Sequence, residues 1–144
     1  MMLNGRKGRL HELQATRRAV ELACTEAGIG VADLDFAEVH DCFTINELLC
    51  AEAIGLSEPG RAGFDLMEGK FDPEGDCPIN LSGGLKAKGH PVGATGASMH
   101  ALAYKQLTGQ PIGIAAKENA EIAMTANIGG SGVTNCVSVL RRIQ

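Results

Sequence analysis

Glycine is unevenly distributed along this 144-residue chain, and its placement constrains the fold more than any other sequence feature. The glycines concentrate in three short segments, at residues 82–84, 89–96 and 129–132. Such clusters mark tight turns or close approaches of the backbone to another group, because glycine adopts positive φ angles without steric cost. The regular elements must therefore lie between these segments.

Hydrophobic periodicity outside the glycine segments predicts an α/β fold. Helices are predicted over residues 10–27, 44–55 and 91–109, and strands over residues 36–39, 121–126 and 133–140. Gly28 follows the first helix as a natural C-terminal stop. Thr44 and Glu47 have the spacing of a capping box at the start of the second helix. The order of the strands in the sheet is left open by the sequence.

Residues 57–80 interrupt this pattern with several prolines and glycines. We predict a long loop there, with at most a short helix around residues 64–68, and loops of this length usually have a function or contact a partner. No repeat or low-complexity tract divides the chain. We therefore interpret residues 1–144 as a single domain.

Composition and charge exclude several classes of protein. The net charge of −4 argues against a general affinity for nucleic acid or anionic membranes. No apolar run is long enough to span a bilayer, and the basic residues at 1–9 are not followed by the apolar stretch of a secretory signal. The five cysteines are odd in number and have no zinc-knuckle or CxxC spacing, so we expect free thiols in a cytoplasmic protein and no bound metal.

Two turns hold the residues with the clearest chemical potential. His40, Asp41, Cys42 and Phe43 lie between a predicted strand and a helix, where polar side chains of open α/β folds reach ligands. Cys42 precedes a helix N-terminus, where the helix dipole favours a thiolate. His90 lies in the second glycine segment and can donate to an oxyanion or assist a neighbouring thiol. These are the groups that carbon–carbon bond chemistry next to a thioester requires: a base at the α-carbon and donors at the enolate oxygen.

Three motifs in this order resemble the C-terminal half of the thiolase family. The string Gly-His-Pro-Val-Gly-Ala-Thr-Gly at 89–96, preceded by Ser-Gly-Gly at 82–84, resembles the thiolase histidine loop. His-Asp-Cys-Phe at 40–43 resembles the form found in sterol-carrier-protein-type thiolases, where most other thiolases have Asn-Glu-Ala-Phe. Asn-Ile-Gly-Gly-Ser-Gly at 127–132 completes the set. The resemblance extends from about residue 9 to the C-terminus and implies an incomplete thiolase-like C-terminal half, with a mixed sheet packed with helices.

The resemblance implies a role for four residues. Cys42 would be the acid/base that moves the α-proton, and His90 would activate the nucleophilic cysteine and donate to the oxyanion hole for the thioester oxygen. His40 would replace the Asn that holds a water in that hole, and the Gly129 N–H would help to form a second oxyanion hole. Most thiolases have a second catalytic cysteine where this chain has Asn127, and in the sterol-carrier-protein type the cysteine of His-Asp-Cys-Phe takes over that work.

The nucleophilic cysteine of thiolases lies in the N-terminal half, and nothing in this sequence matches it. We therefore expect a fragment, a split-gene subunit or a degenerate relative that is inactive alone. With an N-terminal half or a full-length thiolase chain as partner, the expected activity is that of an acyltransferase of lipid metabolism. It would catalyse thiolysis of 3-oxoacyl-CoA or the reverse Claisen condensation, with acyl-CoA and CoA as substrates and no cofactor.

Two other functions are compatible with the sequence. The chain is also similar to thiolase-like aldolase subunits that act on CoA thioesters, some of which work with an OB-fold, zinc-ribbon partner. Alternatively it is a non-catalytic, truncated or scaffold subunit. Such a subunit would bind a partner and would expose an apolar face when alone. Homo-oligomers are compatible with all three functions.

Other polar and sulfur-containing residues have simpler interpretations. We expect Cys24, Cys50 and Cys136 to lie in the core and Cys77 to be exposed in the long loop. Asp41 and Glu38 would orient the turn or be solvated. Lys86 and Lys88 would either meet CoA phosphates or lie in a solvated loop, and His11 and His100 would be surface or packing residues on helices.

Overall fold

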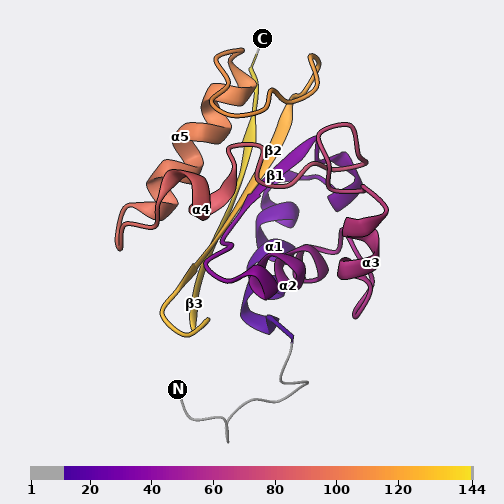
Figure 1. Cartoon of the computed structure of the whole chain (residues 1–144), viewed down its shortest axis with the longest axis vertical. Coiled ribbons are helices and arrows are strands. Elements are labelled where there is room, and N and C mark those ends of the chain that lie inside the picture. The colour runs from indigo at the N-terminus through magenta and orange to yellow at the C-terminus, as the bar shows by residue number, and fades with distance from the viewer. Residues whose placement is uncertain (1–11, 144) are drawn as a thin grey trace, which may run out of the picture.

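A computed structural model describes residues 12–143 and confirms the α/β class, with a small mixed sheet between two helical layers (Figure 1). The elements in chain order are α1 (Gln14–Ala27), a 3₁₀ turn η2 (Val31–Asp33), β1 (Phe36–Val39), α2 (Thr44–Ile54), α3 (Ala62–Met67), α4 (Gly84–Lys88), α5 (Thr95–Leu107), β2 (Ile122–Gly129) and β3 (Thr134–Arg141). Helices α1 and α2 cover one face of the sheet, and α5 covers the other. No helix in the described part of the chain is long and apolar enough to cross a bilayer.

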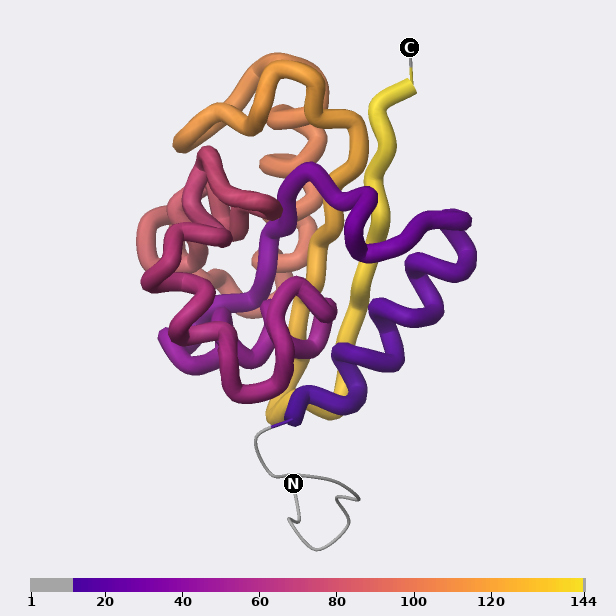
Figure 2. Tube along the Cα trace, turned by 90° about the vertical axis from the view of Figure 1, so that its right-hand side faces the viewer, coloured from indigo at the N-terminus to yellow at the C-terminus, as the bar shows by residue number. Residues whose placement is uncertain are grey.

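The three strands lie side by side in the order β1-β2-β3 (Figure 2). Strands β1 and β2 are parallel, with Phe36 opposite Ala123, whereas β2 and β3 form an antiparallel hairpin. At the outer edge of β1, Ile79 forms a parallel bridge with Ala37. The long segment between α2 and α4 therefore returns to the sheet and covers an edge that would otherwise be open.

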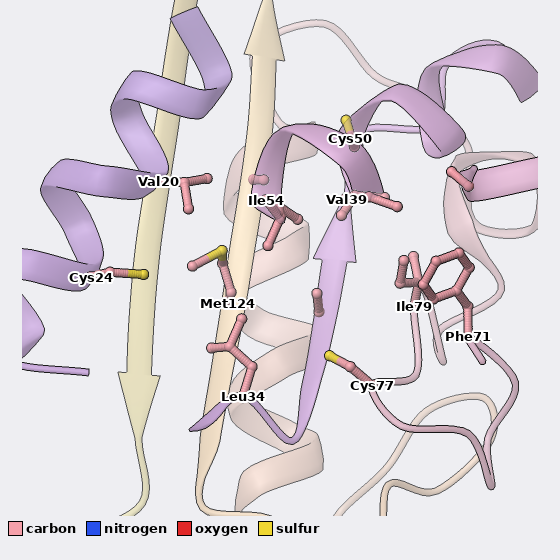
Figure 3. Close-up of a cluster of buried hydrophobic side chains, with 14 of the residues drawn as sticks. Val20, Cys24, Leu34, Val39, Cys50, Ile54, Phe71, Cys77, Ile79 and Met124 are labelled. Atoms are coloured by element: carbon pink, nitrogen blue, oxygen red, sulfur yellow. The ribbon is translucent and has the colours of Figure 1, made fainter. Parts of the chain in front are cut away.

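Side chains alternate between the two faces of the sheet, and each face has its own core. Ala37, Val39 and Met124 pack with α1 and α2 in the larger cluster (Figure 3). Phe36 and Ala123 pack with α5 in the smaller one. Because both faces are covered, all four residues of β1 are buried. Even-numbered residues of β1 and odd-numbered residues of β2 therefore face α5.

The predicted elements are all present, with shifted ends. The first predicted helix is observed as α1 within the described residues, and it stops at Gly28 with a φ of 66°, as expected. The predicted insert in the long loop is α3, and α5 begins four residues later than the sequence suggested. Helix α4 was not predicted, because its five residues lie within a glycine-rich segment that we interpreted as a turn.

The predicted capping box at the start of α2 is wrong. Phe43 is the N-cap residue, and no side chain caps the helix. The Glu47 carboxylate accepts instead a hydrogen bond from the Asn80 side-chain amide at 3.3 Å. Thr44 is exposed to solvent. Of the two residues of the predicted capping box, Glu47 therefore contacts the loop that follows α2, and neither caps the helix.

Two cysteines lie where they were not expected. Cys77 is buried in the larger core cluster, although we expected it to be exposed. Cys136 is exposed, although we expected it in the core, because it lies on the edge strand β3 and α5 packs mainly over β2. Cys24 and Cys50 are buried, as predicted.

Replacement of Met124 by Ala tests the larger core. Met124 is fully buried, so Met124→Ala should lower the free energy of unfolding by about 2–5 kcal/mol, through lost contacts and a residual cavity. The matched control is Met67→Ala, since Met67 is 86% exposed and its truncation should change stability by about 0.5 kcal/mol at most. Urea denaturation of both variants measures the difference, and equal effects would contradict this packing.

Candidate functional site

His40 follows β1 directly and lies on the α5 face of the sheet. Because side chains alternate along a strand, His40 shares this face with Glu38. The parallel register continues past the strand, since the His40 N–H donates to the carbonyl of Ala126 at 3.0 Å. This register places Asn127, the next residue of β2, beside the histidine.

Hydrogen bonds hold both the ring and the backbone carbonyl of His40. The ring is buried, and its Nδ1 lies 2.8 Å from the Asn127 Oδ1. The His40 carbonyl accepts hydrogen bonds from the Asn46 side-chain amide and the Cys50 thiol, both on α2. The sequence identified Asn127 only as a departure from the thiolase pattern, so its contact with His40 is a feature that sequence reasoning missed.

His90 lies on the exposed loop between α4 and α5 and contacts His40. The centroids of the two rings are 4.8 Å apart, and the rings are edge to face with an interplanar angle of 82°. The His90 Nδ1 lies 2.7 Å from the Thr95 hydroxyl, which in turn donates to the Pro91 carbonyl at 3.1 Å. The loop thus brings together two of the histidines that the sequence selected, from positions fifty residues apart.

Cys42 and His90 line the same cavity, which has a volume of about 760 Å³. The cavity lies between the turn after β1, the start of α2 and the segment from Ile79 to His90. Its lining combines apolar and charged groups, including Phe43, Glu47 and Lys86. The structure therefore places two of the predicted catalytic residues on one hollow surface, with the third, His40, against the ring of His90.

The Cys42 thiol is less acidic than the sequence suggested. Burial is the largest influence and raises its pKa, and the neighbouring carboxylate of Asp41 acts in the same direction. The backbone N–H groups of Phe43 and Cys42 favour the thiolate, as expected at a helix start, but they do not compensate for burial. The helix start therefore favours the thiolate, as predicted, but burial outweighs this effect and the net result is a raised pKa of Cys42.

Gly129 is less directly connected to this site. It ends β2 and pairs with Thr134 in the hairpin to β3, two residues beyond Asn127. Gly129 is not among the described residues that line the cavity with Cys42 and His90. Its role in a second oxyanion hole stays a prediction.

A buried ion pair joins the sheet to the histidine loop. Glu38, in the middle of β1, is fully buried, and its carboxylate accepts hydrogen bonds from the Lys88 ammonium at 2.8 Å and from the Ser82 hydroxyl at 2.6 Å. The Lys88 side chain is only 14% exposed and also donates to Ser82. Lys88 is therefore neither solvated nor free for a CoA phosphate. The available sequence signal was an acidic residue inside an otherwise apolar strand.

Asp41 orients the turn, as one of the simpler interpretations predicted. Its carboxylate accepts a hydrogen bond from the Leu85 N–H at 2.9 Å and so holds the start of α4. Gly84 is required there, because its φ is 66° and a Cβ would collide with that carboxylate. Burial and the nearby Asp41 charge raise the pKa of Glu47, on the cavity wall.

Of the remaining candidates, only Lys86 lies at the site. Lys86 is exposed and lines the cavity, so a ligand phosphate can still reach it. His100 lies on α5, as expected, where its ring contacts the Gly96 carbonyl and the Thr125 hydroxyl, and His11 lies outside the described residues. Residues 12–143 contain no group of three or more His, Cys, Asp or Glu side chains placed to hold a metal ion.

Comparison with known proteins identifies the family to which this sequence is similar. Residues 5–142 match the family described as "Thiolase C-terminal domain-like". An acetyl-CoA acetyltransferase of Methanothermobacter thermautotrophicus is 45% identical over 130 residues, which cover 90% of this chain and 34% of that protein. Sterol carrier protein 2 of Rattus norvegicus is 40% identical over 119 residues, covering 83% of this chain and 21% of that protein.

A solved structure has the same fold. The chain named "Ltp2-ChsH2(DUF35) aldolase" superposes with a TM-score of 0.75, covering 95% of this chain and 34% of that one. Its sequence identity is 18%, so the likeness concerns the fold alone. In each of these comparisons the chain spans about a third or less of the other protein's length.

The Glu38–Lys88 pair can be tested by removing one partner. Lys88→Met leaves an uncompensated buried carboxylate and should lower the free energy of unfolding by about 3–5 kcal/mol. Glu38→Gln in the same chain removes that charge and should restore part of the loss. The matched control is Arg18→Met, which breaks the exposed Arg18–Glu21 pair and should cost about 1 kcal/mol or less. A Lys88→Met chain as stable as the control would contradict the buried pair.

The protonation of Cys42 can be tested by its alkylation rate. The rate of alkylation by iodoacetamide follows the thiolate fraction, which for an ordinary cysteine reaches one half at a pH of about 8.5. Because burial raises the pKa of Cys42, its rate should reach half of its maximum at a higher pH in the folded chain. Mass spectrometry of the peptide that contains Cys42 measures the rate, and the same chain in denaturant supplies the reference. If the rate in the folded chain levels off at a lower pH than the rate in the denatured chain, the folded chain holds Cys42 as a thiolate.

Proposed function

The chain belongs to the family of thiolase C-terminal domain-like proteins, and from this membership we propose that it provides the Cys42 and His90 side of a thiolase active site. The proposed reaction is thiolysis of a 3-oxoacyl-CoA or the reverse Claisen condensation, with CoA and acyl-CoA as substrates. The observation that carries the proposal is the shared cavity, which is lined both by Cys42 and by His90, a histidine whose Nδ1 is fixed by the Thr95 hydroxyl.

Burial raises the pKa of Cys42 and so keeps it in the thiol form, which is the form that a general acid needs in the thiolysis direction. Attack of a nucleophilic cysteine thiolate on the 3-oxo carbon breaks the bond between C2 and C3 of the substrate. The acyl group stays on that cysteine, and the bonding electron pair becomes the enolate of the shortened thioester. Cys42 then gives its proton to C2, which requires that the thiol be protonated at the start of the step. The thiol of CoA later attacks the acyl-cysteine, which leaves as a thiolate, and His90 accepts the proton that CoA loses. That proton then returns to Cys42, which is a thiolate after protonating C2, and the cycle is closed.

We further propose that the nucleophilic cysteine comes from an N-terminal thiolase half or from a full-length thiolase chain. This is consistent with the share of 34% that the chain covers in the Methanothermobacter acetyltransferase. Large apolar side chains lie exposed at and next to the cavity, with Phe43 72% and Val92 97% exposed. A partner half over the cavity would cover them and would exclude water from the acyl-enzyme.

An aldolase subunit acting on CoA thioesters is the second candidate. The fold likeness to the chain named Ltp2-ChsH2(DUF35) aldolase favours it, and in that case an OB-fold, zinc-ribbon subunit is the expected partner. Cleavage of a β-hydroxyacyl-CoA, rather than of a 3-oxoacyl-CoA, would identify this activity. For either enzyme we propose a reducing cytoplasm, in which free thiols are the ordinary state of cysteine.

The test is thiolysis by the chain together with whatever polypeptides co-purify with it from its own source. With acetoacetyl-CoA and CoA as substrates, Cys42→Ala and His90→Ala should each lower kcat by about 10²- to 10⁴-fold, the usual contribution of a general acid or base. The matched control is Cys136→Ala, an exposed thiol outside the cavity, which should leave kcat unchanged. A co-purifying chain with a reactive cysteine is expected. Absence of both the partner and the activity would favour a non-catalytic scaffold subunit.

A further inference from the structure

The hydrogen bonds of the two site histidines determine which ring nitrogen carries the proton. At His90 the neighbouring group is Thr95, whose hydroxyl has a single proton and donates it to the Pro91 carbonyl. The hydroxyl oxygen can then only accept from the His90 Nδ1, 2.7 Å away. His90 is therefore protonated at Nδ1, and in the neutral ring Nε2 has the lone pair.

The same tautomer is selected at His40 by a different residue. Its Nδ1 faces the Asn127 Oδ1 at 2.8 Å, and an amide oxygen only accepts hydrogen bonds. His40 thus also carries its proton at Nδ1. Within residues 12–143, neither Nε2 has a hydrogen-bond partner, and the two rings touch at 4.8 Å between centroids. Two basic nitrogens of neighbouring rings are left available to a ligand.

We propose that Asn127 is a positioning residue that holds His40 in the Nδ1–H tautomer, so that Nε2 accepts a hydrogen bond from a water molecule. A water that donates one proton to Nε2 has its second proton available for the thioester oxygen of the substrate. In the opposite tautomer the Nε2–H would donate to the water, both protons of the water would be free, and His40 would no longer direct one of them toward the thioester oxygen. Asn127 therefore decides how the water is oriented. The orientation of the water toward the substrate rests on the proposed function, whereas the tautomer of His40 does not.

The position of Asn127 explains why this contact is specific. It lies on β2 beside the residue that follows β1, so the sheet register itself brings the amide to the ring. On its other side the Asn127 amide nitrogen lies against Gly96, where a Cβ would come within 3.1 Å of it. The amide is thus confined between the start of α5 and His40.

Nuclear magnetic resonance of the full chain tests the proposal directly. Long-range ¹H–¹⁵N correlation spectra of the ¹⁵N-labelled chain report the tautomer of each of the four histidines, and a His40→Gln variant assigns the His40 signals. At about pH 8, where ordinary histidines are neutral, His40 should be the Nδ1–H tautomer. In Asn127→Leu, which has no acceptor, most of His40 should change to Nε2–H.

Two further variants separate this role from general damage. Asn127→Asp keeps an oxygen acceptor, so it should retain Nδ1–H, and its negative charge should move the titration of His40 to higher pH. Thr95→Val removes the acceptor at His90 and should change the tautomer of His90 without changing that of His40. If Asn127→Leu does not fold, as judged by its thermal melt, the wild-type spectrum and the titration of Asn127→Asp still decide the question. Three results would overturn the proposal: an Nε2–H tautomer of His40 in the wild type, an unchanged His40 tautomer in Asn127→Leu, or an unchanged His40 titration in Asn127→Asp.

Activity of the assembled enzyme tests the proposed function separately. There, Asn127→Leu should lower kcat more than it changes KM, by less than the roughly 100-fold loss typical of deleting a direct oxyanion donor. If Asn127→Leu changes the tautomer of His40 but not kcat, Asn127 does hold His40 in the Nδ1–H tautomer. The same result would contradict the proposal that His40 orients a water at a thiolase site.

Discussion

The parallel register between β1 and β2 is the constraint on which the site depends. Side chains alternate along a strand, so a shift of one residue would move Glu38 and His40 from the α5 face to the face covered by α1 and α2. Phe36 and Val39, buried on opposite faces, oppose such a shift because each fills its own cluster. The apolar core therefore fixes not only the stability of the sheet but also the direction in which its polar residues point.

The ion pair between Glu38 and Lys88 extends this constraint to the histidine loop. A loop rich in glycine has a large conformational entropy, and His90 lies on its exposed side. The buried carboxylate holds the loop at Ser82 and Lys88, while Asp41 holds it at Leu85. A buried pair of this kind contributes little net stability compared with an apolar pair. Its value here is geometric, since it sets where the segment before His90 lies.

The sequence predicted much of this arrangement, and its failures have physical causes. Periodicity located the strands and the long helices because burial on one or two faces leaves a regular pattern, and the motifs selected Cys42, His40 and His90. The pairing of His40 with Asn127 was not visible, because it depends on the register between strands separated by more than eighty residues. The capping box at Thr44 failed because Glu47 had a competing partner in Asn80, which only the folded loop supplies.

The Cys42 environment also limits what can complete the site. Desolvation is the main cause of its raised pKa, so any surface that covers the cavity and removes more water will raise the pKa further. A partner that covers the cavity with apolar groups therefore keeps Cys42 in the thiol form over a wider pH range, and it makes that thiol a weaker acid. Hydrogen-bond donors or positive charge placed near the sulfur would act in the opposite direction and would favour the thiolate. The protonation state of Cys42 is thus a property of the assembled cavity and not of this chain alone.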